Sequence, residues 1–162
     1  MRRIEIFCAL GVLVLAPVAV VAQHEHGSSH SRGAKVMGFD QDRTAHHFPL
    51  FNDGGAIEVS VNDLADVANR DAIRSHLRHI AVMFASGEFD APMLVHDSKN
   101  VPGTRTMSSL KDRIRYAYVE VPNGGRINIV TSDREAIDAV HQFLKFQIRE
   151  HKTGDSTAVQ SR

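Results

Sequence analysis

Two stretches of the chain share one alternation of apolar and polar positions. In NDGGAIEVSVND (52–63) and PNGGRINIVTSD (122–133), a turn and a glycine pair precede apolar or β-branched residues at every second position. A period of two is typical of a strand with one buried face, and Asn or Asp followed by Gly favours a hairpin turn. We therefore predict two β-hairpins, whose first strands are Thr44–Phe51 and Arg113–Val121.

After each hairpin the apolar spacing becomes helical. RDAI (70–73) returns as REAI (134–137), and LRHIAVMFASGE (77–88) matches LKFQIREHKTGD (144–155) in spacing. At about 100° per residue, each helix has one apolar stripe: Ile73, Leu77, Ile80 and Phe84 in the first, and Ile137, Leu144 and Ile148 in the second. Glycines at 87 and 154 are expected to end the helices, and Ser132 with Glu135 predicts a capping box for the second.

The repeated pattern predicts an α+β fold with two layers. Two ββα units give a four-stranded, mostly antiparallel sheet with two helices on one face. We expect residues 36–155 to form a single domain. The segment Glu88–Asp112 has two prolines and no clear period before a short helix near Met107–Asp112, so we expect it to be largely a crossover loop.

The ends of the chain follow other patterns. Arg2 and Arg3 precede an apolar run that ends in small residues, which predicts a signal peptide over residues 1–22; an uncleaved membrane anchor is the alternative. After cleavage we expect no stable membrane span and an exported protein, periplasmic or extracellular. Residues 23–35 are polar and rich in histidine, and with residues 156–162 they are predicted to be disordered.

The composition and the absence of known motifs argue against several classes of function. The 162 residues carry 19 basic and 19 acidic side chains and no Trp, which argues against nucleic-acid binding. The single cysteine, Cys8, lies in the predicted signal peptide, so the mature chain would have no thiol. The sequence contains no phosphate-binding glycine loop, no glycine-flanked nucleophilic serine and no His-Glu-x-x-His helix.

The ten histidines are the remaining candidates for a site. His76 and His79 lie three residues apart beside Met83, a set that suits copper; the alternative is that they only border the apolar stripe. His141 either bonds to a backbone carbonyl or meets His46 or His47, of which only one can face inward from a strand. In the tail, His24 and His26 are candidate copper ligands.

Three functions are compatible with these residues. The first is an exported domain that binds a metal ion, copper or zinc, or a small ligand through its histidines. The second is a metal-assisted or His/Asp hydrolase that uses His96, Asp97 and a helix histidine. The third is a protein-interaction module with incidental histidines. Because no nucleophile motif or carboxylate cluster is present, the balance is against an enzyme.

Four segments together resemble a family of small, exported bacterial proteins without an assigned function. They are VMGFDQ, HHFPLF, HLRHIAVMF and FLKFQIREHKTGD, and the likeness spans Val36–Asp155. Some members carry a transcarbamylase label, but GTRTM (103–107) has Gly103 where the transcarbamylase phosphate loop has its first serine. The resemblance implies export and one compact domain, and it implies no mechanism.

Overall fold

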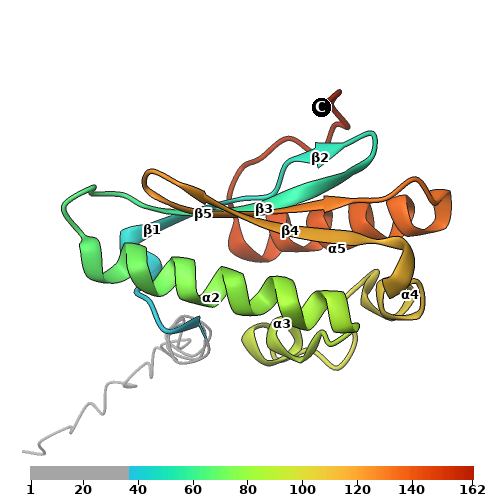
Figure 1. The fold of residues 1–162 in the computed structure, drawn as a ribbon, viewed down its shortest axis with the longest axis horizontal. Helices are drawn as coiled ribbons and strands as arrows, with labels where there is room; N and C mark the ends of the chain where they lie inside the picture. Colours follow the sequence, from blue (N-terminus) through green and yellow to red (C-terminus); the bar gives the residue numbers. More distant parts are fainter. Residues whose placement is uncertain (1–36) are drawn as a thin grey trace, which may run out of the picture.

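The computed structural model describes residues 37–162 (Figure 1). The predicted signal peptide and histidine-rich tail lie outside the described residues. In chain order the elements are η1 (Gln41–Arg43), β1 (Thr44–His47), β2 (Leu50–Phe51), β3 (Gly54–Val61), α2 (Val67–Ser86), α3 (Asp90–Val95), α4 (Thr104–Ser109), η2 (Lys111–Arg113), β4 (Arg115–Val121), β5 (Gly124–Val130) and α5 (Arg134–His151).

The sheet is antiparallel, with strand order β1-β3-β5-β4 and β2 paired to β3. The register between the two central strands, β3 and β5, is symmetric. Ile57 of β3 pairs with Ile127 of β5, which is the equivalent residue of the second repeat, seventy positions later in the chain. On either side of this pair, Gly54 lies opposite Val130, and Gly124 lies opposite Ser60. The two predicted hairpins are therefore confirmed, and they meet along their second strands.

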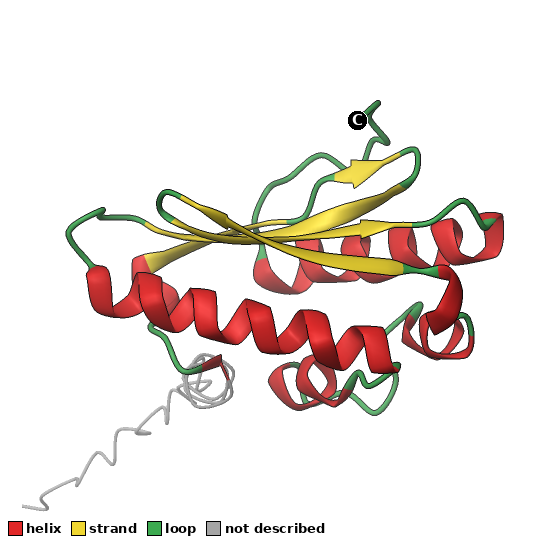
Figure 2. Ribbon diagram, in the orientation of Figure 1, coloured by secondary structure: helices red, strands yellow, loops and turns green. Residues whose placement is uncertain are grey.

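Both long helices pack on the same face of the sheet. A Cβ on Gly55 of β3 would meet Leu144 of α5, and a Cβ on Gly125 of β5 would lie 3.1 Å from Cδ1 of Leu77 in α2. Gly55 is in register with Ile129 and Val59 with Gly125, so these positions share one side. Figure 2 shows the helices below the sheet, as the two-layer α+β prediction requires.

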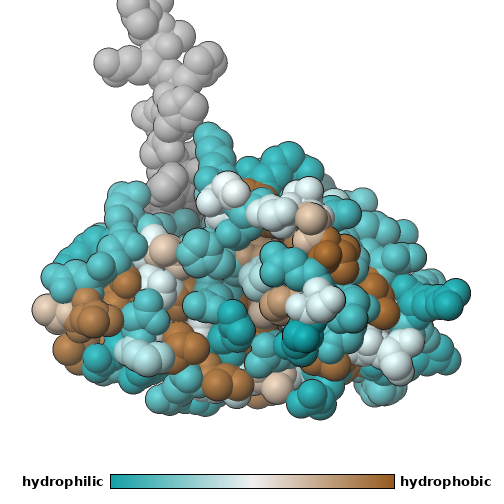
Figure 3. Space-filling view, turned by 90° about the horizontal axis from the view of Figure 1, so that it is seen from above, coloured by the Kyte–Doolittle hydropathy of each residue, from teal (hydrophilic) through white to brown (hydrophobic). Residues whose placement is uncertain are grey.

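The opposite face of the sheet is more polar. Glu58 and Arg126 are cross-strand partners and form an ion pair of 2.6 Å. Figure 3 shows this side, where hydrophilic side chains surround small hydrophobic patches. The expectation of a disordered C-terminus is wrong for residues 156–162: Gln160 forms a parallel bridge with Phe51, and Arg162 pairs with Asp53 at 3.0 Å. The sequence pattern did not indicate these contacts because the partners are remote in the chain.

Three further predictions need correction. The cap of α5 is Asp133, which accepts from the Ala136 N–H at 3.1 Å, and the helix ends at Lys152 rather than at Gly154. Gly87 does end α2, with a φ of 85°. The segment expected to be a crossover loop contains α3 and α4, which bury Val95 and Met107 against the core. The predicted short helix near Met107–Asp112 overlaps α4 and η2, whereas α3 escaped the sequence pattern because six residues span less than two full turns.

The described part of the chain has no helix that is both long and apolar enough to cross a membrane.

Candidate functional site

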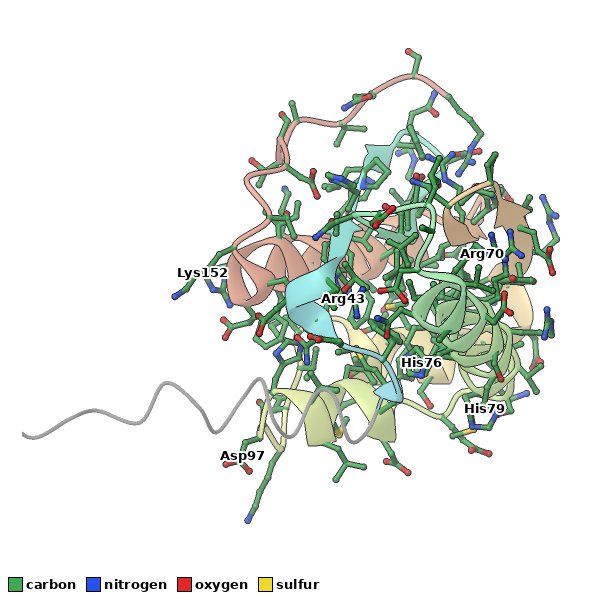
Figure 4. The ribbon with its side chains drawn as sticks, turned by 90° about the vertical axis from the view of Figure 1, so that its left-hand side faces the viewer. Arg43, Arg70, His76, His79, Asp97 and Lys152 are labelled. Carbon is green, nitrogen blue, oxygen red and sulfur yellow. The ribbon has the colours of Figure 1, made fainter. Side chains whose placement is uncertain are left out.

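A partly open cavity of about 70 Å³ lies between the sheet and the helices. Its walls come from β1, β3, α2, α3, α5 and the segment before η1. Figure 4 shows α3 below the space between α2 and α5, so α3 covers the side of the cavity opposite the sheet. Before η1, Phe39 lines the cavity, and the next residue, Asp40, donates its N–H to Asn69 Oδ1 of α2 at 3.1 Å.

Four histidines from four parts of the fold line this cavity: His46, His76, His96 and His151. The register pairs His46 with buried Val59 and His47 with Glu58, so His46 is the strand histidine that faces the helices. The His46 and His151 rings are stacked with centroids 4.9 Å apart, and the His96 ring meets His151 edge-on at 5.0 Å. Phe39 contacts both His46 and His76, with centroids 5.9 and 5.7 Å away.

Three of the four cavity histidines, His46, His76 and His96, have a lowered pKa. Burial, followed by the nearby His76 and His47 rings, lowers the pKa of His46 to about 4. Burial and the neighbouring His79 lower the pKa of His76 to about 4. Burial also lowers the pKa of His96, against the opposing effects of Gln147 and Glu150. Among the described residues, no Lys, Arg, Asp or Glu lines the cavity, so these residue types supply no compensating charge for an ionic guest there.

Gln147 is the most buried polar side chain at the cavity, with 4% of its surface exposed. The His96 Nε2–H donates to Gln147 Oε1 at 3.0 Å. The amide nitrogen of Gln147 has no hydrogen-bond partner in the described part of the chain, and neither does buried His46 Nε2. Unpaired buried polar atoms are uncommon in folded proteins and cost stability, so these two require an explanation.

The structure separates most of the predicted metal ligands. His76 lines the cavity, whereas His79 is exposed on the outer side of α2 and Met83 packs against the core (Figure 4). His47, whose side chain is 52% exposed, pairs with Asp155 at 2.8 Å. Within residues 37–162, no group of three or more His, Cys, Asp or Glu side chains is arranged to hold a metal ion. His24 and His26 lie outside the described residues.

His141 is fixed by the backbone. Its Nε2–H points at two carbonyl oxygens, those of Phe51 at 2.9 Å and Gly54 at 3.0 Å. Because both partners are acceptors, Nε2 must carry the proton. Of the two alternatives for His141, the bond to a carbonyl is therefore confirmed, and it does not meet His46 or His47. Its role is to tie α5 to the turn before β3.

The hydrolase hypothesis also meets a different arrangement from the one predicted. His96 directs Nε2 to Gln147, and Asp97 lies at the outer end of the α3 region, as Figure 4 shows. The hypothesis grouped His96 with an unspecified helix histidine, and His96 does meet His151 of α5; Gln147 was not predicted as a partner. The only signal for Gln147 was its spacing of four residues from His151 on α5, which places the two on the same helix face.

The second ββα unit has no equivalent histidine. Tyr116 pairs with Ile129 as His46 pairs with Val59, seventy positions earlier in the chain. Its ring contacts Phe84 edge-on at 5.8 Å, and burial raises the pKa of its hydroxyl. Only the first unit therefore places a strand histidine at the cavity, and the second unit contributes His151 from its helix.

Comparison of the chain with protein-family models, with curated proteins and with solved structures yields no match.

Proposed function

We propose that this protein is an exported domain that binds a small ligand in the cavity lined by His46, His76, His96 and His151. The observation that carries the proposal is the buried amide nitrogen of Gln147, which has no partner among residues 37–162 although the side chain lines a partly open cavity. Ligand sites are mostly apolar and contain a few polar groups that orient the ligand. This cavity has that composition, with aromatic and aliphatic walls around histidine and glutamine side chains.

The size of the cavity restricts what can enter it. Its volume of about 70 Å³ is roughly half that of an engineered cavity of about 150 Å³ that binds benzene. A group of about four or five non-hydrogen atoms fits this scale. Either a very small molecule or the end of a slender one is therefore the expected ligand.

A metal ion is the second candidate. Two imidazoles that bind one metal at about 2.0–2.1 Å and a tetrahedral angle have ring centroids about 5 Å apart. The His46–His151 and His96–His151 separations, 4.9 and 5.0 Å, match this value. Neutral imidazole is also the form that binds copper and zinc. Because the stacked His46 and His151 rings do not converge on one point, metal binding requires at least one ring to rotate.

A titration of the full chain tests both candidates. Small organic probes, Cu⁺ and Zn²⁺ are added separately, and shifts in two-dimensional NMR spectra locate any binding. We expect saturable shifts at the residues that line the cavity. Ala91→Leu, which fills the cavity from α3, should abolish them. Ala85→Leu, on the exposed side of α2, is the matched control and should not.

The titration also distinguishes a small organic ligand from a metal ion. Organic probes that compete with each other at the cavity support the first candidate. Binding of Cu⁺ or Zn²⁺ that is lost in His46→Phe and His151→Phe but kept in His79→Phe supports the second. If no probe and no metal shifts the cavity residues, both candidates are wrong and the interaction module becomes the better hypothesis.

A further inference from the structure

The unpaired groups of the cavity restrict the chemistry of its ligand. From them we infer that the ligand is uncharged and carries a hydroxyl or carbonyl oxygen that bonds to the Gln147 amide nitrogen and to His46 Nε2. This inference rests on the proposed ligand-binding function and specifies the class of molecule bound.

The two ends of the Gln147 amide differ in their hydrogen bonds. The Gln147 oxygen already accepts from His96, so the free end of the amide is a donor that faces no acceptor in the described residues. A ligand oxygen supplies this acceptor. Neutral His46 can present Nε2 either as a donor to a carbonyl or as an acceptor from a hydroxyl, so both kinds of oxygen satisfy the pair.

The same wall disfavours charged ligands. A carboxylate or an ammonium group loses its hydration on entry and needs an opposite charge in return. None of the described residues that line the cavity is Lys, Arg, Asp or Glu, and Gln147 is a dipole rather than an ion. The remaining walls, which include Phe39, Phe48 and Val59, suit an apolar body behind the oxygen.

Five probes of nearly equal size distinguish the effect of an oxygen atom on affinity from the effect of a charge. They are butan-1-ol, butan-2-one, 1-chlorobutane, butyrate and butylammonium, each titrated into the full chain at pH 7 and followed by NMR. One hydrogen bond to a buried group corresponds to about a tenfold change in affinity. We expect the alcohol and the ketone to bind about tenfold more tightly than 1-chlorobutane, and both ions to bind more weakly than the alcohol by at least that factor.

Matched variants connect this preference to one side chain. Gln147→Met keeps a similar volume and removes the amide, and it should reduce the advantage of the alcohol and ketone over 1-chlorobutane to the part that His46 supplies. Gln142→Met, on the exposed side of the same helix, should leave the advantage intact. His46→Phe gives an independent reading if Gln147→Met fails to fold, because it removes the second unpaired atom and keeps a ring.

The outcomes distinguish this inference from the function on which it rests. Equal binding of all uncharged probes, or an unchanged preference in Gln147→Met, would overturn the oxygen contact and leave the cavity as a binding site. Tightest binding of butyrate or butylammonium would overturn the uncharged class. If no probe binds and a crystal structure shows only ordered water against Gln147, the inference fails together with organic-ligand binding.

Discussion

Gly55 and Leu144 lie against each other because Gly55 has no side chain: the δ-methyl of Leu144 occupies the space that a Cβ would need. The second unit repeats the relationship with the partners exchanged, since Gly125, seventy positions after Gly55, faces Leu77 of α2. Each hairpin thus receives the leucine of the other unit's helix. This exchange joins the two ββα units into one core.

The two glycines should differ in their tolerance of alanine. At Gly55 a new Cβ also lies 2.7 Å from the carbonyl oxygen of Pro49, which is backbone and cannot rotate away. At Gly125 the nearest atoms, Tyr118 Cε2 at 2.9 Å and Leu77 Cδ1 at 3.1 Å, belong to side chains that can move. We expect Gly55→Ala to cost about 2–3 kcal/mol and Gly125→Ala about 1 kcal/mol. Urea denaturation measures both, and equal costs would contradict the packing described.

Leu77 and Leu144 should be equally important to stability. Both are buried, with 2% and 0% of their surface exposed, and they occupy matching positions of the two helices. Leu→Ala at either site should lower the free energy of unfolding by about 2–5 kcal/mol. Leu64→Ala is the control, because this leucine is 66% exposed and its loss should change stability by less than about 0.5 kcal/mol. A small effect at both buried sites would be incompatible with this core.

Stability should fall in mild acid because of His46 and His76. Their pKa values are about 4 in the folded protein, against 6.5 for a free histidine. Above pH 6.5 both rings are neutral in either state. Between pH 6.5 and 4 the unfolded chain takes up protons that the folded protein refuses, so stability is lost as the pH falls through this window. The full loss is on the order of 3 kcal/mol for each ring.

Denaturation midpoints at pH 7.5 and pH 4.5 measure this loss. His46→Phe and His76→Phe should each reduce the difference between the two midpoints. His79→Phe, on the exposed side of α2, removes only the smaller of the two causes that lower the pKa of His76, so it should change the difference less than either of these variants. Wild-type stability that is independent of pH over this range would show that the two rings are not held neutral by burial.

Asp155 should contribute more to the stability of the protein than the whole of residues 156–162. Asp155 accepts from the Phe48 N–H at 2.8 Å and from the Thr153 hydroxyl at 2.9 Å, and it pairs with His47. Asp155→Ala leaves these groups without their acceptor and should cost about 1–3 kcal/mol. Deletion of residues 156–162 removes the Arg162–Asp53 pair, whose side chains are each 35% exposed, and the bridge between Gln160 and Phe51. Because water can replace the partners of exposed groups, the deletion should cost less than Asp155→Ala. The opposite order would assign the anchoring role to Arg162.

We also predict that the mature protein begins near Gln23. The basic start, apolar run and small residues of positions 1–22 are the basis for this prediction. Mass spectrometry of protein isolated from its native cell envelope should find an N-terminus within a few residues of Gln23. An intact Met1 on protein that needs detergent for extraction would indicate a retained anchor instead.

The sequence by itself determined the periodic parts of this protein. Alternation after the paired glycines predicted both hairpins, and the spacing of Ile73, Leu77, Ile80 and Phe84 predicted the buried stripe of α2, because these features depend on neighbours within one strand or helix. Helix α3 and the C-terminal contacts lacked such a signal: α3 is too short to show a period, and Gln160 pairs with a residue more than a hundred positions away.

Only the tertiary structure decided which side chains come together at the cavity. The choice between His46 and His47 follows from the register that places His46 opposite Val59, and register is a property of two strands. His96 and Gln147 come together because α3 folds back below α5, which no local pattern indicates. The histidines that were grouped by their spacing, His76 with His79, point in different directions from α2. The sequence thus supplied the imidazoles, and the packing of two ββα units selected which of them share one cavity.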